Sequence, residues 1–190
     1  MISAVLADDH IVVRTGIKML LDADPDIEVV AEAAEGTEAY SLVARYKPDV
    51  LLLDISMPPG QSGLIACEKT AKDFPDTKVV ILTMFAEPEY LLYTLRGGAA
   101  GYVLKNSTPE QLRQAVHDVA NGGSYIHPTM VELLAKHAAG GYTAFTILIM
   151  VLCSNLCYRY GVSAIWLFGL ERSLRLVFMF LGRCVYEYGR

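Results

Sequence analysis

The first 122 residues alternate short apolar segments with longer amphipathic ones. The short segments are rich in Val, Ile and Leu and are bounded by turn-forming or charged residues, which is typical of buried strands. They are Ile2–Ala7, Ile27–Ala33, Val50–Asp54, Lys78–Thr83 and Gly101–Leu104. Because each is followed by a stretch with apolar residues three or four positions apart, the pattern predicts five βα units around a parallel sheet.

The amphipathic stretches predict the helices of these units. They are Ile11–Asp22, Gly36–Arg45, Ser62–Asp73, Pro88–Arg96 and Pro109–Asn121. The last helix has the clearest beginning, because Ser107 or Thr108 can cap it and Pro109 suits its first position. Glu110 follows Ser107 at the spacing of a capping box.

A short segment follows, in which Met130, Val131, Leu133 and Leu134 can form one apolar helical stripe. We therefore expect a folded domain over residues 1–122 and a linker helix over 123–137. Residues 138–190 differ in composition and form an apolar tail, which we expect to be helical or disordered.

Charge separates the same parts of the chain. Lys and Arg number 11 against 19 Asp and Glu in residues 1–137, and 5 against 2 in residues 138–190. An acidic first part disfavours nonspecific nucleic-acid binding, since Lys and Arg supply the affinity for phosphate. The amino terminus lacks the basic region of a secretory signal, and the four cysteines lack zinc-site spacing, so we expect a cytoplasmic protein with reduced thiols.

Polar residues follow four of the predicted strands. Asp8 and Asp9 follow the first strand, Asp54 ends the third, Thr83 ends the fourth and Lys105 follows the fifth. In a parallel α/β sheet the carboxyl ends of the strands meet at one edge, where side chains that carry out chemistry gather. Three carboxylates at one edge repel each other unless a cation lies among them, and oxygen ligands of this kind suit Mg²⁺.

Phosphoryl transfer to a carboxylate needs a nucleophilic aspartate, a metal ion that neutralises charge and donors for the phosphoryl oxygens. Asp54 is the candidate nucleophile. The other assignments are Asp8, Asp9, Asp54 and the Ser56 backbone carbonyl to Mg²⁺, and Thr83 and Lys105 to the phosphoryl oxygens. His10, beside the acid pair, is interpreted as a surface or packing residue rather than a ligand.

Four stretches, VLADDH, DVLLLDISMPPGQSG, VVILTMF and GAAGYVLK, resemble in order and separation the signature blocks of response-regulator receiver domains. Within that superfamily, DDHIVVRTGI, MPPGQSG and GYVLK are most similar to the NarL/FixJ (LuxR-type) family. The resemblance covers about residues 1–137. It implies a flavodoxin-like (CheY-like), doubly wound, five-stranded parallel sheet in the order 2-1-3-4-5, with residues 1–122 as the receiver domain.

The resemblance also implies a function. A cytoplasmic response regulator accepts a phosphoryl group on Asp54 from a sensor histidine kinase and switches conformation to control transcription. It is not a turnover enzyme and catalyses only its own Mg²⁺-dependent phosphorylation and slow hydrolysis. The resemblance further implies that on phosphorylation Thr83 moves toward the phosphoryl group and Tyr102 swings inward. This reshapes the face of the fourth helix, fifth strand and fifth helix, through which receivers form homodimers.

Two other functions stay open: a receiver that acts only as an interaction module or membrane-tethered regulator without DNA binding, and a hydrolase that uses Asp54 on phosphate esters. Relatives of this type continue into a DNA-binding helix-turn-helix, but residues 138–190 lack its LTxRExEVL and NKEIA patterns. Three explanations of this tail compete. One is a shifted reading frame near Ala138. The second is a membrane span over Ala138–Tyr158, which are 21 residues without charge, and the third is a set of packed apolar helices.

Overall fold

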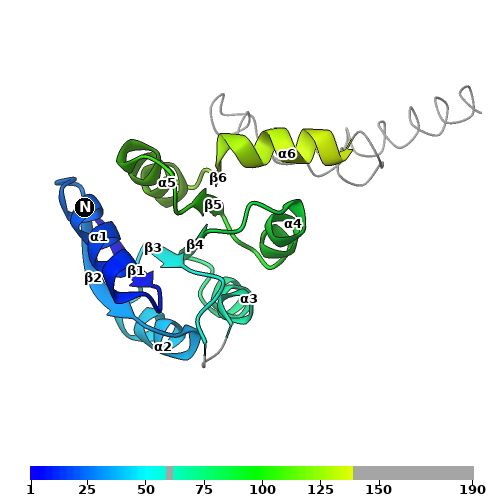
Figure 1. The fold of residues 1–190 in the computed structure, drawn as a ribbon. Helices are drawn as coiled ribbons and strands as arrows, with labels where there is room; N and C mark the ends of the chain where they lie inside the picture. Colours follow the sequence, from blue (N-terminus) through cyan, green and yellow to red (C-terminus); the bar gives the residue numbers. More distant parts are fainter. Residues whose placement is uncertain (59–61, 139–190) are drawn as a thin grey trace, which may run out of the picture. The chain divides into compact units, whose positions relative to one another are not determined.

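The computed structural model describes residues 1–58 and 62–138. Within these ranges the strands and helices alternate (Figure 1). In chain order they are β1 Ile2–Ala7, α1 Ile11–Asp22, β2 Ile27–Ala33, α2 Gly36–Tyr46, β3 Val50–Leu53, α3 Gly63–Asp73, β4 Lys78–Thr83, α4 Pro88–Arg96, β5 Gly101–Leu104, α5 Pro109–Ala120, β6 Tyr125–Ile126 and α6 Pro128–Ala138.

The described strands form one parallel sheet in the order β2-β1-β3-β4-β5-β6. The order 2-1-3-4-5 expected from the sequence is confirmed, but the expected number of five strands is wrong. The sixth strand is β6, whose Tyr125 and Ile126 pair with Gly101 and Tyr102 of β5. Two residues are too short to show the alternation by which a strand is recognised in a sequence.

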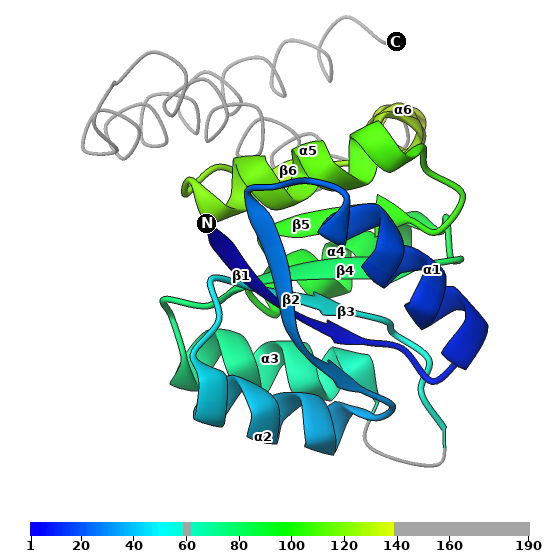
Figure 2. The ribbon, with the colours of Figure 1, turned by 90° about the vertical axis from the view of Figure 1, so that its left-hand side faces the viewer.

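Helices cover both faces of the sheet. Figure 2 shows α2 and α3 on one side of the strands and α1 and α5 on the other. The side chains of β3 alternate between the two faces, with Leu51 and Leu53 in the cluster under α2, α3 and α4, and Val50 and Leu52 in the cluster under α1 and α5. Because both faces of β3 are buried, its sequence is an unbroken apolar run.

Helix α6 lies in the segment that the sequence predicted as a linker helix, and two of its side chains pack into the core. Met130 and Leu134 are 0% and 1% exposed. They share an apolar cluster with Leu91 of α4 and Tyr102 of β5, and α6 contacts α4. The helix therefore extends the layer of α2, α3 and α4 beyond β5.

The beginning of α5 differs in detail from the expectation. Thr108, not Ser107, is the N-cap, and its hydroxyl accepts a hydrogen bond from the backbone N–H of Gln111. The Gln111 side chain accepts in return from the backbone N–H of Thr108, so Gln111 completes the capping box in place of Glu110.

The expectations for the tail, including the membrane span and the missing helix-turn-helix, concern residues 138–190, of which all but Ala138 lie outside the described residues. In the part of the chain that the structure describes, no helix combines the length and apolar character needed to cross a membrane.

Candidate functional site

The candidate site lies at the carboxyl ends of the central strands. Asp8 directly follows β1, Asp54 directly follows β3 and Lys105 directly follows β5. Asp8 is fully buried and Asp54 is 4% exposed. The last side chains of β1 and β3, directly before these two aspartates, are 0–1% exposed. The packed core therefore determines where the two carboxylates lie.

Lys105 contacts two of the carboxylates. Its Nζ lies 2.6 Å from Asp54 Oδ2 and 2.7 Å from Asp8 Oδ2. The Lys105 side chain is 7% exposed, and its backbone N–H donates to the Thr83 carbonyl at 2.8 Å. The ammonium is thus held by the sheet in a position where it bridges two strands.

The two carboxylates and the ammonium change each other's pKa. Burial raises the pKa of Asp54, the charge of Asp8 raises it further, and the hydrogen bond and charge of Lys105 oppose both effects. Burial on its own lowers the pKa of Lys105, but its hydrogen bonds to Asp54 and Asp8 outweigh burial and raise that pKa overall. Lys105 therefore stays charged in this place, and its charge favours ionised Asp54.

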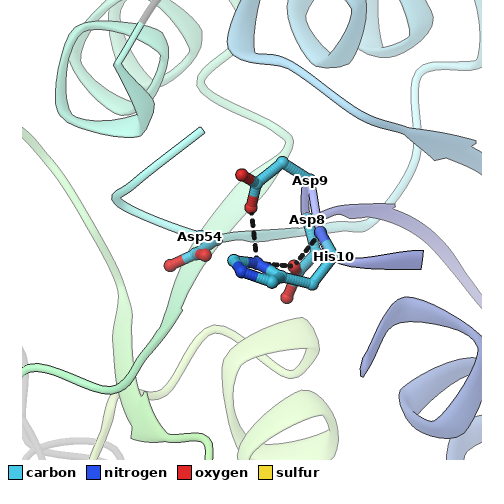
Figure 3. A group of neighbouring side chains, drawn as sticks. All are labelled: Asp8, Asp9, His10 and Asp54. Atoms are coloured by element: carbon cyan, nitrogen blue, oxygen red, sulfur yellow. Dashed lines mark hydrogen bonds and ion pairs between the residues drawn. The ribbon is translucent and has the colours of Figure 1, made fainter. Parts of the chain in front are cut away.

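Asp9 and His10 lie beside Asp8 and Asp54, with the His10 imidazole next to the carboxylates of Asp8 and Asp9 (Figure 3). His10 Nδ1 is 2.7 Å from Asp9 Oδ1 and 3.4 Å from Asp8 Oδ1, and the His10 backbone N–H donates to Asp8 Oδ1 at 2.8 Å. One possible ligand atom from each of Asp8, Asp9, His10 and Asp54 lies within 4.8 Å of the others. From the sequence His10 was interpreted as a surface or packing residue rather than a ligand; its side chain is 65% exposed, yet Nδ1 lies among the possible ligand atoms.

The charge balance of this group suits a divalent cation. Asp8, Asp9 and Asp54 bring three carboxylates to this group and Lys105 brings one ammonium, so with His10 neutral the formal charges of these side chains sum to −2. Carboxylate oxygens are ligands that Mg²⁺ prefers. Ser56 contacts Asp54 through its backbone N–H, which lowers the pKa of that carboxyl.

Thr83 and Tyr102 contact the loop that follows β4. The Thr83 hydroxyl accepts from the Phe85 backbone N–H at 3.2 Å, and the Tyr102 hydroxyl donates to the Phe85 carbonyl at 2.8 Å. Both side chains are fully buried. The structure therefore brings Asp8, Asp54 and Lys105 into direct contact, while the hydrogen bonds of Thr83 and Tyr102 meet at Phe85.

Gly63, at the beginning of α3, was not singled out in the sequence. A Cβ at this position would lie 1.8 Å from the Asp54 carbonyl oxygen, and the Gly63 backbone N–H donates to the Ile55 carbonyl at 3.0 Å. The chain after Asp54 can close onto α3 only because residue 63 has no side chain. Its place in the MPPGQSG loop is the signal that can identify it.

Arg14, on α1, contacts the backbone of Asp8. Its Nη1 donates to the Asp8 carbonyl at 2.5 Å, and its Nε lies 3.1 Å from Glu32 Oε2. The Arg14 side chain is 16% exposed. It thus connects the main chain after β1 to β2, a role that was not predicted from the sequence.

The sequence matches a known family and known relatives. Residues 4–117 match the family described as "Response regulator receiver domain". The chain is 59% identical over 132 residues to "Oxygen regulatory protein NreC" of Staphylococcus aureus (strain JH9), an alignment covering 70% of this chain and 61% of that protein. The chain thus spans about 61% of the length of the curated relatives it matches.

Solved structures agree with this likeness. A two-component response regulator of the LuxR family from Aurantimonas sp. SI85-9A1 is 31% identical, with a TM-score of 0.70 over 73% of this chain and 99% of that one. A DNA-binding response regulator of the LuxR family from Staphylococcus aureus is 31% identical, with a TM-score of 0.60 over 63% of this chain and 99% of that one.

Proposed function

The chain belongs to the response regulator receiver family, and we propose that it accepts a phosphoryl group on Asp54 from a sensor histidine kinase and thereby controls transcription. The observation that carries the proposal is the buried Asp54 carboxylate with the Lys105 ammonium 2.6 Å away. An ammonium in this position can bind an oxygen of the incoming phosphoryl group through a charge-assisted hydrogen bond.

In the proposed reaction an oxygen of Asp54 attacks the phosphorus of a phosphohistidine. The new P–O bond forms as the P–N bond breaks, and the leaving imidazole takes up a proton. Burial raises the pKa of Asp54 overall, and the hydrogen bond and charge of Lys105 counteract part of that rise, which favours the ionised, nucleophilic carboxylate. Lys105 and the Thr83 hydroxyl then donate to phosphoryl oxygens, while Tyr102 responds to the movement of Thr83.

The proposed metal ion is Mg²⁺, held by Asp8, Asp9, Asp54 and the Ser56 backbone carbonyl. The excess of carboxylates over ammonium groups and an all-oxygen set of ligands support this choice. Bound Mg²⁺ would neutralise charge on the transferred group.

Phosphorylation of the full chain by acetyl phosphate, followed by intact mass, tests the proposal. With Mg²⁺ we expect at most one phosphoryl group per chain, and none after chelation or in Asp54→Asn. Asp49→Asn is the matched control, because Asp49 is an acid at the opposite end of β3. Labelling of Asp54→Asn equal to wild type would overturn the proposal, and repeated turnover of a phosphate ester would favour a hydrolase.

The output of the switch is also a proposal. The LuxR-family relative named as DNA-binding supports DNA as a partner, and a homodimer through the face of α4, β5 and α5 would accompany it.

We propose a receiver over residues 1–122, a connecting segment over 123–137 and a separate tail over 138–190. Cys67 is a free buried thiol, the state expected in a cytoplasmic protein.

A receiver that acts without binding DNA is the second candidate, because residues 138–190 lack the helix-turn-helix patterns. An electrophoretic mobility shift with promoter DNA separates the two. A shift of the phosphorylated protein supports transcription control, and its absence supports the interaction module.

A further inference from the structure

His10 lies between the acid pair and α1, and the helix makes no use of its side chain. His10 is the N-cap residue of α1, but its ring accepts no hydrogen bond from the first turn. The main chain holds the residue in place. Its backbone N–H donates to Asp8 Oδ1 at 2.8 Å, and its carbonyl accepts from the Arg14 backbone N–H at 2.9 Å. The imidazole is therefore fixed beside the acids and free for another task.

The Nδ1 atom of this ring faces two carboxylates (Figure 3). It lies 2.7 Å from Asp9 Oδ1 and 3.4 Å from Asp8 Oδ1. Two ligand atoms that each lie about 2.1 Å from one ion, at right angles, are about 3.0 Å apart. The two observed distances lie on either side of that value, so the three atoms are spaced as neighbouring ligands of a single metal ion are.

The Asp9 carboxylate has an oxygen that lacks a donor. Asp9 Oδ1 is buried and has no hydrogen-bond partner in the described part of the chain, so its contact with His10 Nδ1 does not have hydrogen-bond geometry. Lys105 contacts Oδ2 of Asp8 and Oδ2 of Asp54 instead. A buried acceptor without a donor costs free energy. A cation bound by both Asp9 Oδ1 and His10 Nδ1 would remove that cost.

The imidazole changes which cations the group suits. Mg²⁺ prefers oxygen ligands and keeps several of its waters, so the three carboxylates can bind it without the ring. An imidazole nitrogen suits transition-metal ions, whose affinity for nitrogen and oxygen ligands rises from Mn²⁺ through Co²⁺ to Ni²⁺. A nitrogen at this position therefore adds affinity for transition-metal ions and little for Mg²⁺.

We propose that His10 Nδ1 is a ligand at the cation site of Asp8, Asp9 and Asp54, and that the site takes a divalent transition-metal ion in preference to Mg²⁺. The inference rests on the cation site of the proposed function and adds a residue that sets its selectivity. Carboxylates by themselves also favour transition-metal ions to some degree. The contribution of His10 is therefore the difference between wild type and a variant without the ring.

Isothermal titration of the full chain with Co²⁺, and separately with Mg²⁺, measures this difference. His10→Ala should weaken Co²⁺ binding by at least about tenfold, because loss of a group that only supports a ligand already costs about 10–100-fold. Its affinity for Mg²⁺ should stay within about twofold of wild type, because Mg²⁺ prefers oxygen ligands. Co²⁺ bound by thiols elsewhere in the chain is common to both proteins and cancels in the comparison.

Two control variants separate the ring from the carboxylates. His117→Ala removes an imidazole that pairs with Asp24 and should bind both ions as wild type does. Asp9→Asn should weaken the binding of both ions, since it removes a charged oxygen ligand rather than a nitrogen. Equal losses of Co²⁺ and Mg²⁺ affinity in His10→Ala would show that the ring only supports the fold of the site.

Pulsed electron paramagnetic resonance of bound Mn²⁺ detects the nitrogen directly. Wild type and His117→Ala should show the nitrogen coupling of a bound imidazole, and His10→Ala should lack it. The wild-type spectrum needs no variant, so it tests the inference even if a substitution impairs folding.

The outcomes distinguish this inference from the function on which it rests. Mg²⁺ binding and phosphorylation of Asp54, together with equal Co²⁺ affinity in wild type and His10→Ala and no nitrogen coupling, would overturn the role of His10 alone. Absence of binding of both Mg²⁺ and Co²⁺ to wild type would overturn the cation site of the proposed function and this inference with it.

Discussion

The Lys105 ammonium and the Asp54 carboxylate are 51 positions apart in the sequence and 2.6 Å apart in the structure. The same ammonium lies 2.7 Å from Asp8. All three side chains are at most 7% exposed, so water screens these charges little. Lys105 therefore neutralises part of the acidic cluster before any cation binds.

Replacing Lys105 by Ala should leave two buried carboxylates without their partner. We expect the free energy of unfolding at neutral pH to fall by about 3 kcal/mol in chelator, as for other broken buried ion pairs. Mg²⁺ should raise the melting temperature of the variant more than that of wild type, because binding to the native state stabilises it. Chemical and thermal unfolding with and without Mg²⁺ measure both effects.

Lys18→Ala is the control for this substitution. Lys18 pairs with Asp22 on the surface of α1, and such exposed pairs contribute about 0.3–0.5 kcal/mol. An equal response of both variants to Mg²⁺ would contradict a role for Lys105 in balancing the acidic cluster.

Gly63→Ala should disturb the site through the backbone. Its Cβ would lie 1.8 Å from the Asp54 carbonyl oxygen, so the loop between β3 and α3 must move. We expect lower stability and slower phosphorylation by acetyl phosphate, measured by thermal unfolding and by mass.

Gly16→Ala is the matched control, because a Cβ at Gly16 in α1 meets nothing within 4 Å. An alanine in a helix interior should stabilise the protein by about 0.5–1 kcal/mol. Loss of stability in Gly16→Ala, or none in Gly63→Ala, would argue against this explanation.

The two candidate caps of α5 can be told apart by mutation. Thr108→Ala removes the hydroxyl that accepts from the Gln111 backbone N–H, while the backbone N–H of residue 108 can still donate to the Gln111 side chain, and the loss should cost about 1 kcal/mol of stability. Ser107→Ala should cost little, since the buried Ser107 hydroxyl has no hydrogen-bond partner in the described structure. Urea unfolding of both variants measures the difference, and a larger loss for Ser107→Ala would contradict the assignment.

Acid stability should depend on Asp49. Hydrogen bonds from the Ser3 backbone N–H and hydroxyl hold the pKa of Asp49 below its usual 3.8. The native state then binds fewer protons than the unfolded state, so the contribution is present above pH 3.8 and is lost as the pH falls through the lower native pKa.

Asp49→Ala should therefore lower stability at neutral pH and show a shallower loss of stability below pH 3.8 than wild type. Unfolding measured across this acid range gives both slopes. Ser3→Ala, which keeps the backbone donor, should give an intermediate slope, and parallel curves for wild type and Asp49→Ala would contradict the linkage.

Most element boundaries followed from local pattern. Strands buried on both faces, such as β3, are unbroken apolar runs, and α1 shows the helical period, so each can be recognised without its neighbours. The predicted and observed limits of β1, β2, β4, β5, α1 and α4 are the same. The strand order came with the family resemblance rather than with the pattern.

The sequence by itself determined which polar residues follow which strands. Because the carboxyl ends of parallel strands share one edge, it also determined that these residues gather at that edge. Only the tertiary structure decided their partners: Lys105 contacts Asp8 and Asp54, Thr83 and Tyr102 meet at Phe85, and β6 with α6 covers β5. Local periodicity reports burial along one element, whereas these contacts join residues far apart in the sequence and depend on how the elements pack.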